Sequence, residues 1–450
     1  MQPSTDRLIA VDAYRGVVMF LLLPDLFGGF SFHRMARQFP DDPVWANLAA
    51  WFTHVQWSGA SVWDLIMPSF VFLVGVVMPL SAAARRRRGD TEPQIFAHVA
   101  LRAAALLLLP LFLQILHVRE RSYLDELWPF ILLAAGLPVS GRLAAAFGIA
   151  SAPARHRIEL VWWSAILVAS AFRLSANISA IEFEFNHVFS QLALASIFAF
   201  LLVGKSRSVQ VGCLLAILVS YWALFAMVPL AASGFDPSKV GVQPGDEVFS
   251  GLFAHWNKNT NAAAAFDVWF LNLLPRAEPF LFQDKGLQTL NFIPTIATMI
   301  FGVMAGELLL GGRAKTQIRN ALLLAGASVL AAGLLAGQWF CPIVKSIWTP
   351  SWVLFSSGVT ILVLAAFYHA CDMRERRARW AFPFMVLGTN SILLYTLAYY
   401  KWRFLSIPGK LTGIDMFTGT YAPVLGSVVL VAMLWTVAFV LYRAKIFVKL

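Results

Sequence analysis

Long apolar runs recur along the chain, each bounded by a polar segment. A membrane-spanning helix needs about 20 mainly apolar residues, whereas a membrane-spanning β-strand alternates apolar and polar positions over about ten. The runs here are unbroken, so the pattern predicts an all-α, polytopic helical bundle of about 10 to 12 spans. The predicted spans are residues 9–32, 60–82, 97–117, 125–147, 158–175, 188–203, 209–232, 290–310, 321–337, 352–370, 382–400 and 421–441.

Two segments between the predicted spans are long. Residues 33–59 join the first two spans, and residues 233–289 form the longest stretch outside the membrane. The second segment is too rich in Trp, Phe and Leu for disorder, so we expect it to pack as a periplasmic cap over the bundle. No repeat or separate soluble domain stands out, and residues 1–450 are interpreted as one transmembrane domain.

Composition supports the membrane interpretation. Of the 450 residues, 59% are hydrophobic and 13% are charged, with a mean hydropathy of +0.69. A soluble domain has about 25% charged residues, so an ordinary cytosolic enzyme, a disordered chain and a secreted disulfide scaffold are poor interpretations. Cys213, Cys341 and Cys371 are scattered without metal-ligand spacing, so neither a disulfide framework nor a metal site is predicted.

The net charge of +11 is explained by topology rather than by nucleic acid. With the N-terminus in the cytoplasm, the inner segments carry basic residues at about three times the density of the outer ones, as the positive-inside rule requires. The run Arg85–Arg88 fixes the inner end of the second span. We therefore expect a multi-pass protein of a bacterial inner membrane with both termini cytoplasmic, whose first apolar run is a retained span and not a cleaved signal.

The densest chemical signal is a histidine followed by an aspartate. His54 lies just outside the second span, and Asp64 follows ten residues later, about two turns or more inside it. A buried acidic residue normally faces a partner or a water-filled cavity. If the chain folds back at the helix mouth, the carboxylate can orient the imidazole for proton transfer. The alternative is a surface histidine beside an unrelated, structurally paired aspartate.

Other polar residues also interrupt apolar runs. Asp12 and Arg15 share a helical face in the first span, where they either orient the span or meet an anion from the cytoplasm. Asp25 follows Pro24 near the outer end, where it either faces the same vestibule as Asp64 or belongs to a loop. Asn390 places an amide within the eleventh span, where such groups usually bond a neighbouring helix.

Two outer segments offer further candidates for substrate binding. Residues 255–261 combine His255, Trp256 and Asn261 with other amides, and aromatic rings beside amides suit sugars. A capped surface loop accounts for this composition equally well. Lys345 begins a short outer segment that leads into the tenth span.

These motifs together resemble the family of heparan-alpha-glucosaminide N-acetyltransferase and its bacterial transmembrane relatives. The matching stretches are residues 7–16, 54–75, 284–307, 345–351 and 388–395. They occur in the family's order and extend along most of the chain. The most specific is the pattern His-x-x-Trp-x-Gly-x4-Asp-Leu-x-x-Pro-x-Phe, which begins at His54 and includes Trp57 and Asp64.

The resemblance implies transfer of an acyl group from cytoplasmic acetyl-CoA, as co-substrate, to an amine or hydroxyl of an extracytoplasmic glycan. It implies His54 as general base or acyl carrier and Asp64 as its partner, without a metal. It also implies that Asp12 and Arg15 shape the route to the donor. The residues expected to contact the acceptor are Asp25, Trp57, Asn261, Lys345 and Asn390.

The chain departs from the family's pattern at two positions. Family members commonly carry asparagine near the end of the first span, where this chain has Pro24-Asp25. They often carry an acidic residue before the glycine at the eighth span, where Lys285 stands. The first departure concerns acceptor geometry, and the second predicts a changed preference for substrate charge.

Two other function classes remain compatible with the sequence. A transporter or flippase for a sugar or lipid-linked substrate explains the intramembrane polar residues, and paired broken helices or inverted repeats would favour it. A non-catalytic membrane partner would be indifferent to loss of His54. Membrane lipids are expected partners in every case, and a homodimer is compatible with the sequence.

Overall fold

The computed structural model describes residues 8–24, 29–115, 123–135, 152–175, 182–232, 234–276, 278–373, 379–412 and 419–448. Within these ranges the fold is helical, without a β-strand beyond one isolated bridge between Ser58 and Val344. The predicted all-α class is therefore confirmed. The α-helices are α1 (Ile9–Leu22), α2 (Phe32–Gln38), α3 (Pro43–Phe52), α4 (Ile66–Arg87), α5 (Glu92–Ile115), α6 (Tyr123–Ala135), α8 (Ala152–Ser175), α9 (Val188–Phe200), α10 (Arg207–Met227), α11 (Ala262–Leu271), α12 (Phe292–Leu310), α13 (Lys315–Trp339), α14 (Pro350–Phe367), α15 (Phe382–Thr389), α16 (Ser391–Ala398), α17 (Lys401–Thr412) and α18 (Ala422–Arg443).

The helices that can cross a membrane confirm a polytopic protein. In the described part of the chain, 7 helices are long and apolar enough to span a bilayer, or 8 if a bent pair counts as one span. Other predicted spans correspond to shorter helices, such as α9, or extend into residues outside the described ranges. The larger number predicted from the sequence, the inner membrane and the cytoplasmic termini stay predictions.

Two predicted spans differ from the helices observed. The first was expected to continue to residue 32, but α1 ends at Leu22, and Pro24, which has no N–H to continue the helical hydrogen bonds, follows two residues later. The eleventh was expected as one helix, but it breaks at Asn390 into α15 and α16, which are inclined by 69°. Asn390 has φ −125° and ψ 35°, outside the helical region.

The core of the bundle is built around α4 and α12, which pack against each other at close range. A Cβ atom at Gly75 would overlap the backbone of Met299, and one at Gly302 would overlap the backbone of Phe72. Small residues allow such close backbone approach between membrane helices, where van der Waals packing replaces the hydrophobic effect as the driving force. Because α4 begins just after Asp64, this packing fixes the mouth of the helix on which the candidate site is built.

The close packing of α4 and α12 predicts the effect of one added methyl group. We expect Gly302→Ala to lower the free energy of unfolding by about 1–3 kcal/mol, the usual cost of overpacking a core. Thermal unfolding of the purified protein in detergent measures the loss. Gly212→Ala is the matched control, because Gly212 is also helical and a Cβ atom there meets nothing within 4 Å. An equal response of both variants would contradict the packing argument.

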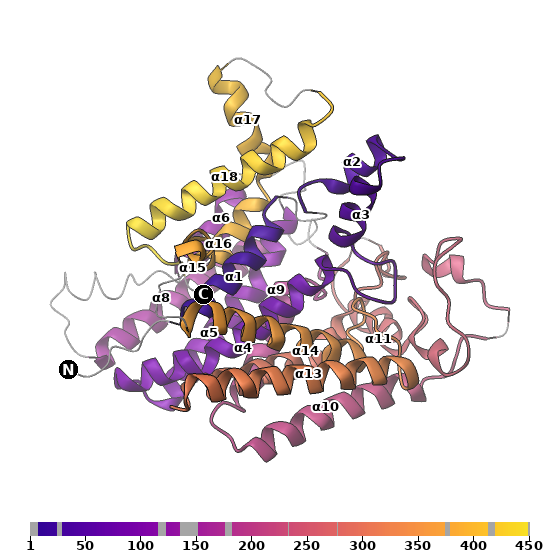
Figure 1. The fold of residues 1–450 in the computed structure, drawn as a ribbon, viewed down its shortest axis with the longest axis horizontal. Coiled ribbons are helices and arrows are strands. Elements are labelled where there is room, and N and C mark those ends of the chain that lie inside the picture. Colours follow the sequence, from indigo (N-terminus) through magenta and orange to yellow (C-terminus); the bar gives the residue numbers. More distant parts are fainter. Residues whose placement is uncertain are drawn as a thin grey trace.

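The long helices α4, α10, α13 and α14 run along one another, and the α3 and α11 segments lie at one end of them (Figure 1). The segment of residues 233–289, predicted as a cap, contains the 3-10 turns Pro237–Val240 and Gly251–Trp256 as well as α11. It contacts the segment that follows α3, through hydrogen bonds to Trp57 and Ser58. Its position relative to a membrane stays a prediction.

Candidate functional site

The position of His54 follows from how α3 begins and ends. Asp42 caps the helix start, because its side chain accepts a hydrogen bond from Val44 N at 2.8 Å. The helix ends at Phe52, and the extended Thr53 donates its hydroxyl back to Ala49 O at 2.8 Å. His54 follows immediately, at the start of the irregular segment that leads into α4.

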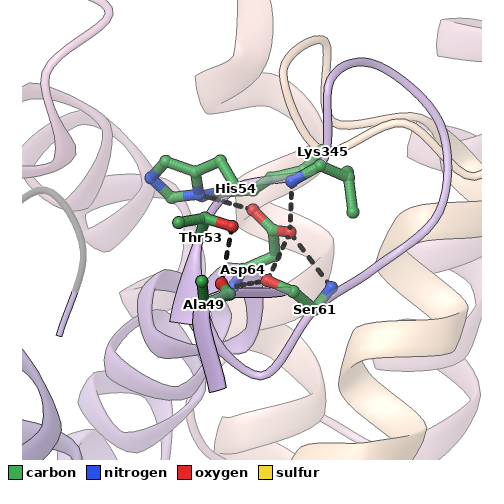
Figure 2. Close-up of polar contacts among 7 residues, drawn as sticks. Ala49, Thr53, His54, Ser61, Asp64 and Lys345 are labelled. Carbon is green, nitrogen blue, oxygen red and sulfur yellow. Dashed lines mark hydrogen bonds and ion pairs between the residues drawn. The ribbon is translucent and has the colours of Figure 1, made fainter. Parts of the chain in front are cut away.

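Asp64 lies beneath His54, in a 3-10 turn (Trp63–Leu65) that precedes α4. The prediction that it lies two turns or more inside the span is therefore wrong, because the membrane helix begins only after this turn. A functional pair requires the chain to fold back at the mouth of the helix, and the structure shows this fold-back. The chain folds back so that His54 Nδ1 lies 2.6 Å from Asp64 Oδ1 (Figure 2).

The Asp64 carboxylate accepts hydrogen bonds on both oxygens. Oδ1 accepts from His54 and from Lys345 Nζ, the latter at 3.1 Å. Oδ2 accepts from Ser61 Oγ at 2.9 Å, from Ser61 N at 3.1 Å and from Val55 N at 3.3 Å. The side chain is only 1% exposed. Such a complete set of donors, one of them a cation, favours the ionised form of a buried carboxylate.

Lys345 reaches the pair from a distant part of the chain. Its ammonium lies 3.0 Å from His54 Nδ1 as well as 3.1 Å from Asp64 Oδ1, and its side chain is 14% exposed. The neighbouring Ser346 carbonyl accepts a hydrogen bond from Asn291 at 2.7 Å, which anchors the turn before α14. The structure thus brings together three candidates that the sequence gave separately (Figure 2).

This geometry determines the tautomer of His54. An ionised carboxylate can only accept hydrogen bonds, so the proton in the 2.6 Å contact belongs to Nδ1, and the Lys345 ammonium, 3.0 Å from the same nitrogen, donates to Asp64 and not to the ring. Nε2 therefore carries a lone pair. It lies on the side of the ring away from Asp64 and Lys345 (Figure 2), and the side chain is 45% exposed. His54 is thus oriented with one nitrogen buried in the site and the other open to an incoming group.

Burial and two neighbouring lysines favour the neutral form of His54. Partial burial lowers the pKa of the imidazole below its ordinary value of 6.5, and the positive charges of Lys345 and Lys285 lower it further, against the opposing effect of Asp64. Burial likewise lowers the pKa of the Lys345 ammonium, against the opposing effect of Asp64. A neutral imidazole with a free Nε2 at neutral pH is the form that can accept a proton.

The residues after His54 are held by the 233–289 segment. Ser58 donates from its backbone N at 3.2 Å and from its hydroxyl at 2.5 Å to one oxygen of Glu247. Trp57 is buried and donates from Nε1 to Trp256 O at 3.0 Å. Gly286 lies against the Trp57 ring so closely that a Cβ atom there would overlap it. Trp57 therefore anchors the segment after His54 to residues 256 and 286.

A hollow of about 200 Å³ lies in the same segment. Its polar lining comes from Glu247, Asn257, Lys258 and Thr260, and apolar side chains such as Val242 complete it. Glu247 joins this hollow to the segment of His54 through its hydrogen bonds to Ser58. Of the polar residues 255–261, one group faces the hollow and a second group holds the fold, and Asn257 belongs to both because its amide bonds the backbone of Phe249.

Asn261 belongs to the second group. Its Oδ1 accepts from Ala264 N at 3.1 Å, which caps α11, and its Nδ2 donates to Asn257 O at 2.9 Å. The oxygen and the nitrogen of the Asn261 amide are therefore both bonded within the loop, as the capped-loop interpretation expects. A role for Asn261 in binding a substrate stays a prediction.

The remaining candidates lie in another part of the bundle. Asn390 donates to Ile446 O at 3.1 Å and accepts from Val448 N at 2.8 Å, so its amide joins the broken helix to the last described residues. Arg15 contacts Gly388 O at 3.5 Å, and the Gly388 position lies against the backbone of Asp12. Asp12, Arg15 and Asn390 thus form a second group around this break. Asp25 lies outside the described residues.

Two residues of the site were not predicted. Ser61 lies three positions before Asp64, and this spacing is typical of a helix start, where a hydroxyl bonds the following turn. The spacing of Ser61 and Asp64 is visible in the sequence and could have indicated this contact. Glu247 lies 189 residues from its partner Ser58, and no local pattern indicates the contact.

Comparison with known proteins identifies two curated relatives. Heparan-alpha-glucosaminide N-acetyltransferase of Homo sapiens is 23% identical over 479 residues, which cover 100% of this chain and 62% of the relative. The protein of the same name from Mus musculus is 22% identical over 469 residues, which cover 99% of this chain and 61% of the relative. The resemblance to this family is confirmed along the chain.

The share of the relatives' length that this chain covers limits what the similarity supports. The chain spans less than two thirds of the length of these relatives. No protein-family model matches it. The relatives are named as N-acetyltransferases that act on a glucosaminide, and a corresponding activity for this chain is argued below from its own residues.

Proposed function

We propose that this protein is a membrane-bound acyltransferase that moves an acetyl or other short acyl group from acyl-CoA to an amine or hydroxyl of an extracytoplasmic glycan. The observation that carries the proposal is the oriented His54–Asp64 pair, whose histidine side chain is 45% exposed and keeps Nε2 on the side of the ring away from Asp64 (Figure 2). The similarity to two N-acetyltransferases supports the reaction class. Transfer of labelled acetyl from acetyl-CoA to glucosamine by the purified protein tests it.

The proposed reaction uses the free nitrogen of His54. The acceptor nitrogen or oxygen forms a bond to the acyl carbon, the carbon–sulfur bond of the thioester breaks, and the acceptor's proton passes to Nε2. The proton then leaves with the CoA thiolate. Asp64 stabilises the imidazolium that forms between these steps, because its carboxylate accepts the Nδ1 proton throughout.

A covalent route would use the same nitrogen. In that route Nε2 attacks the thioester, CoA leaves, and the acceptor displaces the acyl group from the ring. The two routes differ in whether CoA is released before an acceptor arrives. A rapid burst of CoA without acceptor indicates acyl-histidine, and its absence alongside acceptor-dependent release indicates direct transfer.

The donor is proposed to enter from the opposite end of the bundle. The run Arg85–Arg88 ends α4, about 33 Å from Asp64 at the usual rise per residue. The CoA phosphates would remain near these arginines and the second group of candidates around Arg15.

The acceptor is proposed to bind at the hollow beside Ser58. Ser58 follows His54 by four residues, so their backbones lie within about 14 Å of each other, a distance that a short oligosaccharide covers. Glu247 and Thr260 offer oxygen groups to sugar hydroxyls. Lys285, which stands where relatives often carry an acidic residue, adds positive charge near His54.

The electrostatics of the pair predict how Lys345→Met changes the pH dependence. Only the neutral ring accepts a proton, so activity falls as the pH drops through the pKa of His54. Because Lys345 lowers that pKa, its loss raises the pKa and moves the acid limb of the kcat/KM profile to higher pH. The plateau at alkaline pH should change much less.

Lys285→Met is the matched control for this profile. Lys285 also lowers the pKa of His54 but contributes less than Lys345, so the acid limb should move in the same direction by a smaller amount. Profiles of the three proteins, recorded at saturating acyl-CoA, measure both shifts. An acid limb that stays in place or moves to lower pH in Lys345→Met contradicts the assigned role.

The broken helix formed by α15 and α16 bears on the transporter alternative. The break between α15 and α16 at Asn390 is the kind of feature that forms binding sites in transporters. In this chain, however, both groups of the Asn390 amide bond the backbone of residues 446 and 448. No second broken helix of this kind occurs among the described residues. The oriented His54–Asp64 pair therefore favours the acyltransferase.

A further inference from the structure

Buried oxygen atoms without a hydrogen-bond partner gather where the 233–289 segment meets α12. In the described part of the chain, the buried side-chain oxygens that lack a partner belong to Gln114, Ser357, Asp267, Gln288, Thr289 and Asn291. The last four residues come from α11 and from the 3-10 turn Thr289–Asn291 with the residue before it, which lead directly into α12. They are between 1% and 6% exposed, and we call them the oxygen cluster.

A hydrogen bond joins the two elements of the oxygen cluster. Asp267 Oδ2 accepts from Thr289 N at 2.9 Å, so the carboxylate lies against the turn. The Thr289 hydroxyl lies beside the carboxylate and lowers its pKa, but it is outside hydrogen-bond geometry. A 3-10 turn rises about 2 Å per residue, so Gln288, Thr289 and Asn291 start within about 6 Å of one another along it. The four side chains therefore start from one small region.

The two amides of the oxygen cluster cannot turn round to satisfy their oxygens. Gln288 Nε2 donates to Asn259 Oδ1 at 3.3 Å, and Asn291 Nδ2 donates to Ser346 O at 2.7 Å. Asn259 is itself fixed, because its nitrogen donates to two backbone carbonyls. Exchanging the oxygen and nitrogen of either amide would place two acceptors face to face. A buried acceptor without a donor destabilises the fold unless a bound group supplies the positive charge.

Asp267 adds a negative charge to these neutral oxygens. Burial raises the pKa of its carboxyl to about 6, against the opposing effect of Thr289, so the group is ionised at pH 8. The interactions of this side chain with the described residues include no lysine, arginine or histidine. The charge of Glu184 also acts on Asp267, but Glu184 has its own ion pair with Arg276 at 4.0 Å. Asp267 therefore brings one negative charge that needs a positive partner.

The chemistry of the oxygen cluster points to a metal cation. Carboxylate, amide and hydroxyl oxygens are the ligands that hard cations take in proteins, and the oxygen cluster has no nitrogen or sulfur ligand. One carboxylate balances one positive charge. A monovalent ion therefore leaves no excess charge at a buried position, whereas a divalent ion would leave one.

We propose that Asp267 and the other residues of the oxygen cluster bind one alkali-metal cation, Na⁺ or K⁺, which holds α11 against the start of α12. Asp267 Oδ1 supplies the charge, and the other three residues supply neutral oxygens. The same turn contributes Leu290 to the apolar cluster that contains Trp57 and Trp256. The cation thus stabilises the junction to which the segment after His54 is anchored. It takes no part in acyl transfer, so this site is independent of the proposed function.

Thermal unfolding of the purified protein in detergent tests the proposal. Unfolding is recorded at pH 8 in sodium, potassium or choline chloride of equal ionic strength, and with added calcium chloride. We expect Na⁺ or K⁺ to raise the Tm of the wild type by about 2–5 °C over choline, with a shift that saturates as the cation concentration rises. Asp267→Asn should lose the shift, because the amide keeps the shape of the side chain but not its charge.

Asp236→Asn is the matched control. Asp236 lies in the same 233–289 segment and also accepts from a backbone N, that of Ser238 at 3.0 Å, but it is exposed. We expect this variant to keep the full cation shift. Thr289→Val removes one proposed oxygen and provides the test if Asp267→Asn does not fold. It should weaken the shift and be no less stable than the wild type in choline, because its hydroxyl has no partner.

Three outcomes overturn the proposal. An equal shift in the wild type, Asp267→Asn and Thr289→Val would reflect cations acting on surface charges. Stabilisation by Ca²⁺ without any by Na⁺ or K⁺ contradicts the monovalent ion derived from the single carboxylate. The absence of a response to every cation assigns the four oxygens to bound water.

Discussion

His54→Gln abolishes acyl transfer in this account while leaving the protein folded. Glutamine cannot accept and return a proton near neutral pH, and a general base contributes about 10²- to 10⁴-fold to rate. The fold should survive, because the side chain is 45% exposed and Asp64 keeps its bonds to Lys345, Ser61 and Val55. Steady-state kcat with acetyl-CoA and an amino-sugar acceptor measures the loss.

A second histidine supplies the control for this variant. His255 lies in the neighbouring segment, where Nδ1 contacts Val228 O at 3.0 Å, and it takes no part in the proposed chemistry. We expect His255→Gln to keep kcat within about threefold, as is usual for changes away from the reacting atoms. Substantial transfer by His54→Gln, with acceptor-dependent CoA release intact, would remove His54 from the mechanism.

Asp64→Asn has the second large expected effect. The amide keeps the size of the side chain but removes the negative charge that stabilises the imidazolium, and it permits the wrong tautomer of His54. Loss of the corresponding carboxylate in serine proteases costs about 10⁴-fold, and we expect about 10²- to 10⁴-fold here. The variant also leaves the Lys345 ammonium buried without a counter-charge, a change that usually costs about 3–5 kcal/mol of stability.

The double variant Asp64→Asn with Lys345→Met separates these two effects. Removing both charges relieves the unpaired ammonium, so the free energy of unfolding should recover most of what Asp64→Asn loses. Catalysis should stay low, because the imidazolium still lacks its partner. Recovery of both stability and transfer in the double variant would show that Asp64 only compensates Lys345.

The sequence predicted the helical bundle because unbroken apolar runs have few structural alternatives in a membrane. It predicted the ends of helices less well. Pro24 ends α1 early, and the break at Asn390 has no proline or glycine at the break itself to indicate it. The depth of Asp64 was also wrong, because a 3-10 turn precedes α4 and keeps the carboxylate at the helix mouth.

The candidate site was predictable only where its parts are close in the chain. His54 and Asp64 are ten residues apart, and their pairing could be stated as a condition on how the chain folds back. Lys345 is 281 residues from Asp64, so only the packing of the turn before α14 against this loop brings its ammonium into the site. The resemblance to a family pointed to the region of Lys345 without indicating this contact.

The central claim is that the protein transfers an acyl group from CoA to an amino sugar. The most direct measurement follows CoA thiol release and product formation together, with purified protein in nanodiscs, labelled acetyl-CoA and glucosamine. We expect both products to appear in equal amounts and the acetylated sugar to disappear with His54→Gln. Absence of acylated product with acetyl-, propionyl- and butyryl-CoA, together with sugar flux across proteoliposomes containing the protein, would contradict the account and support the transporter.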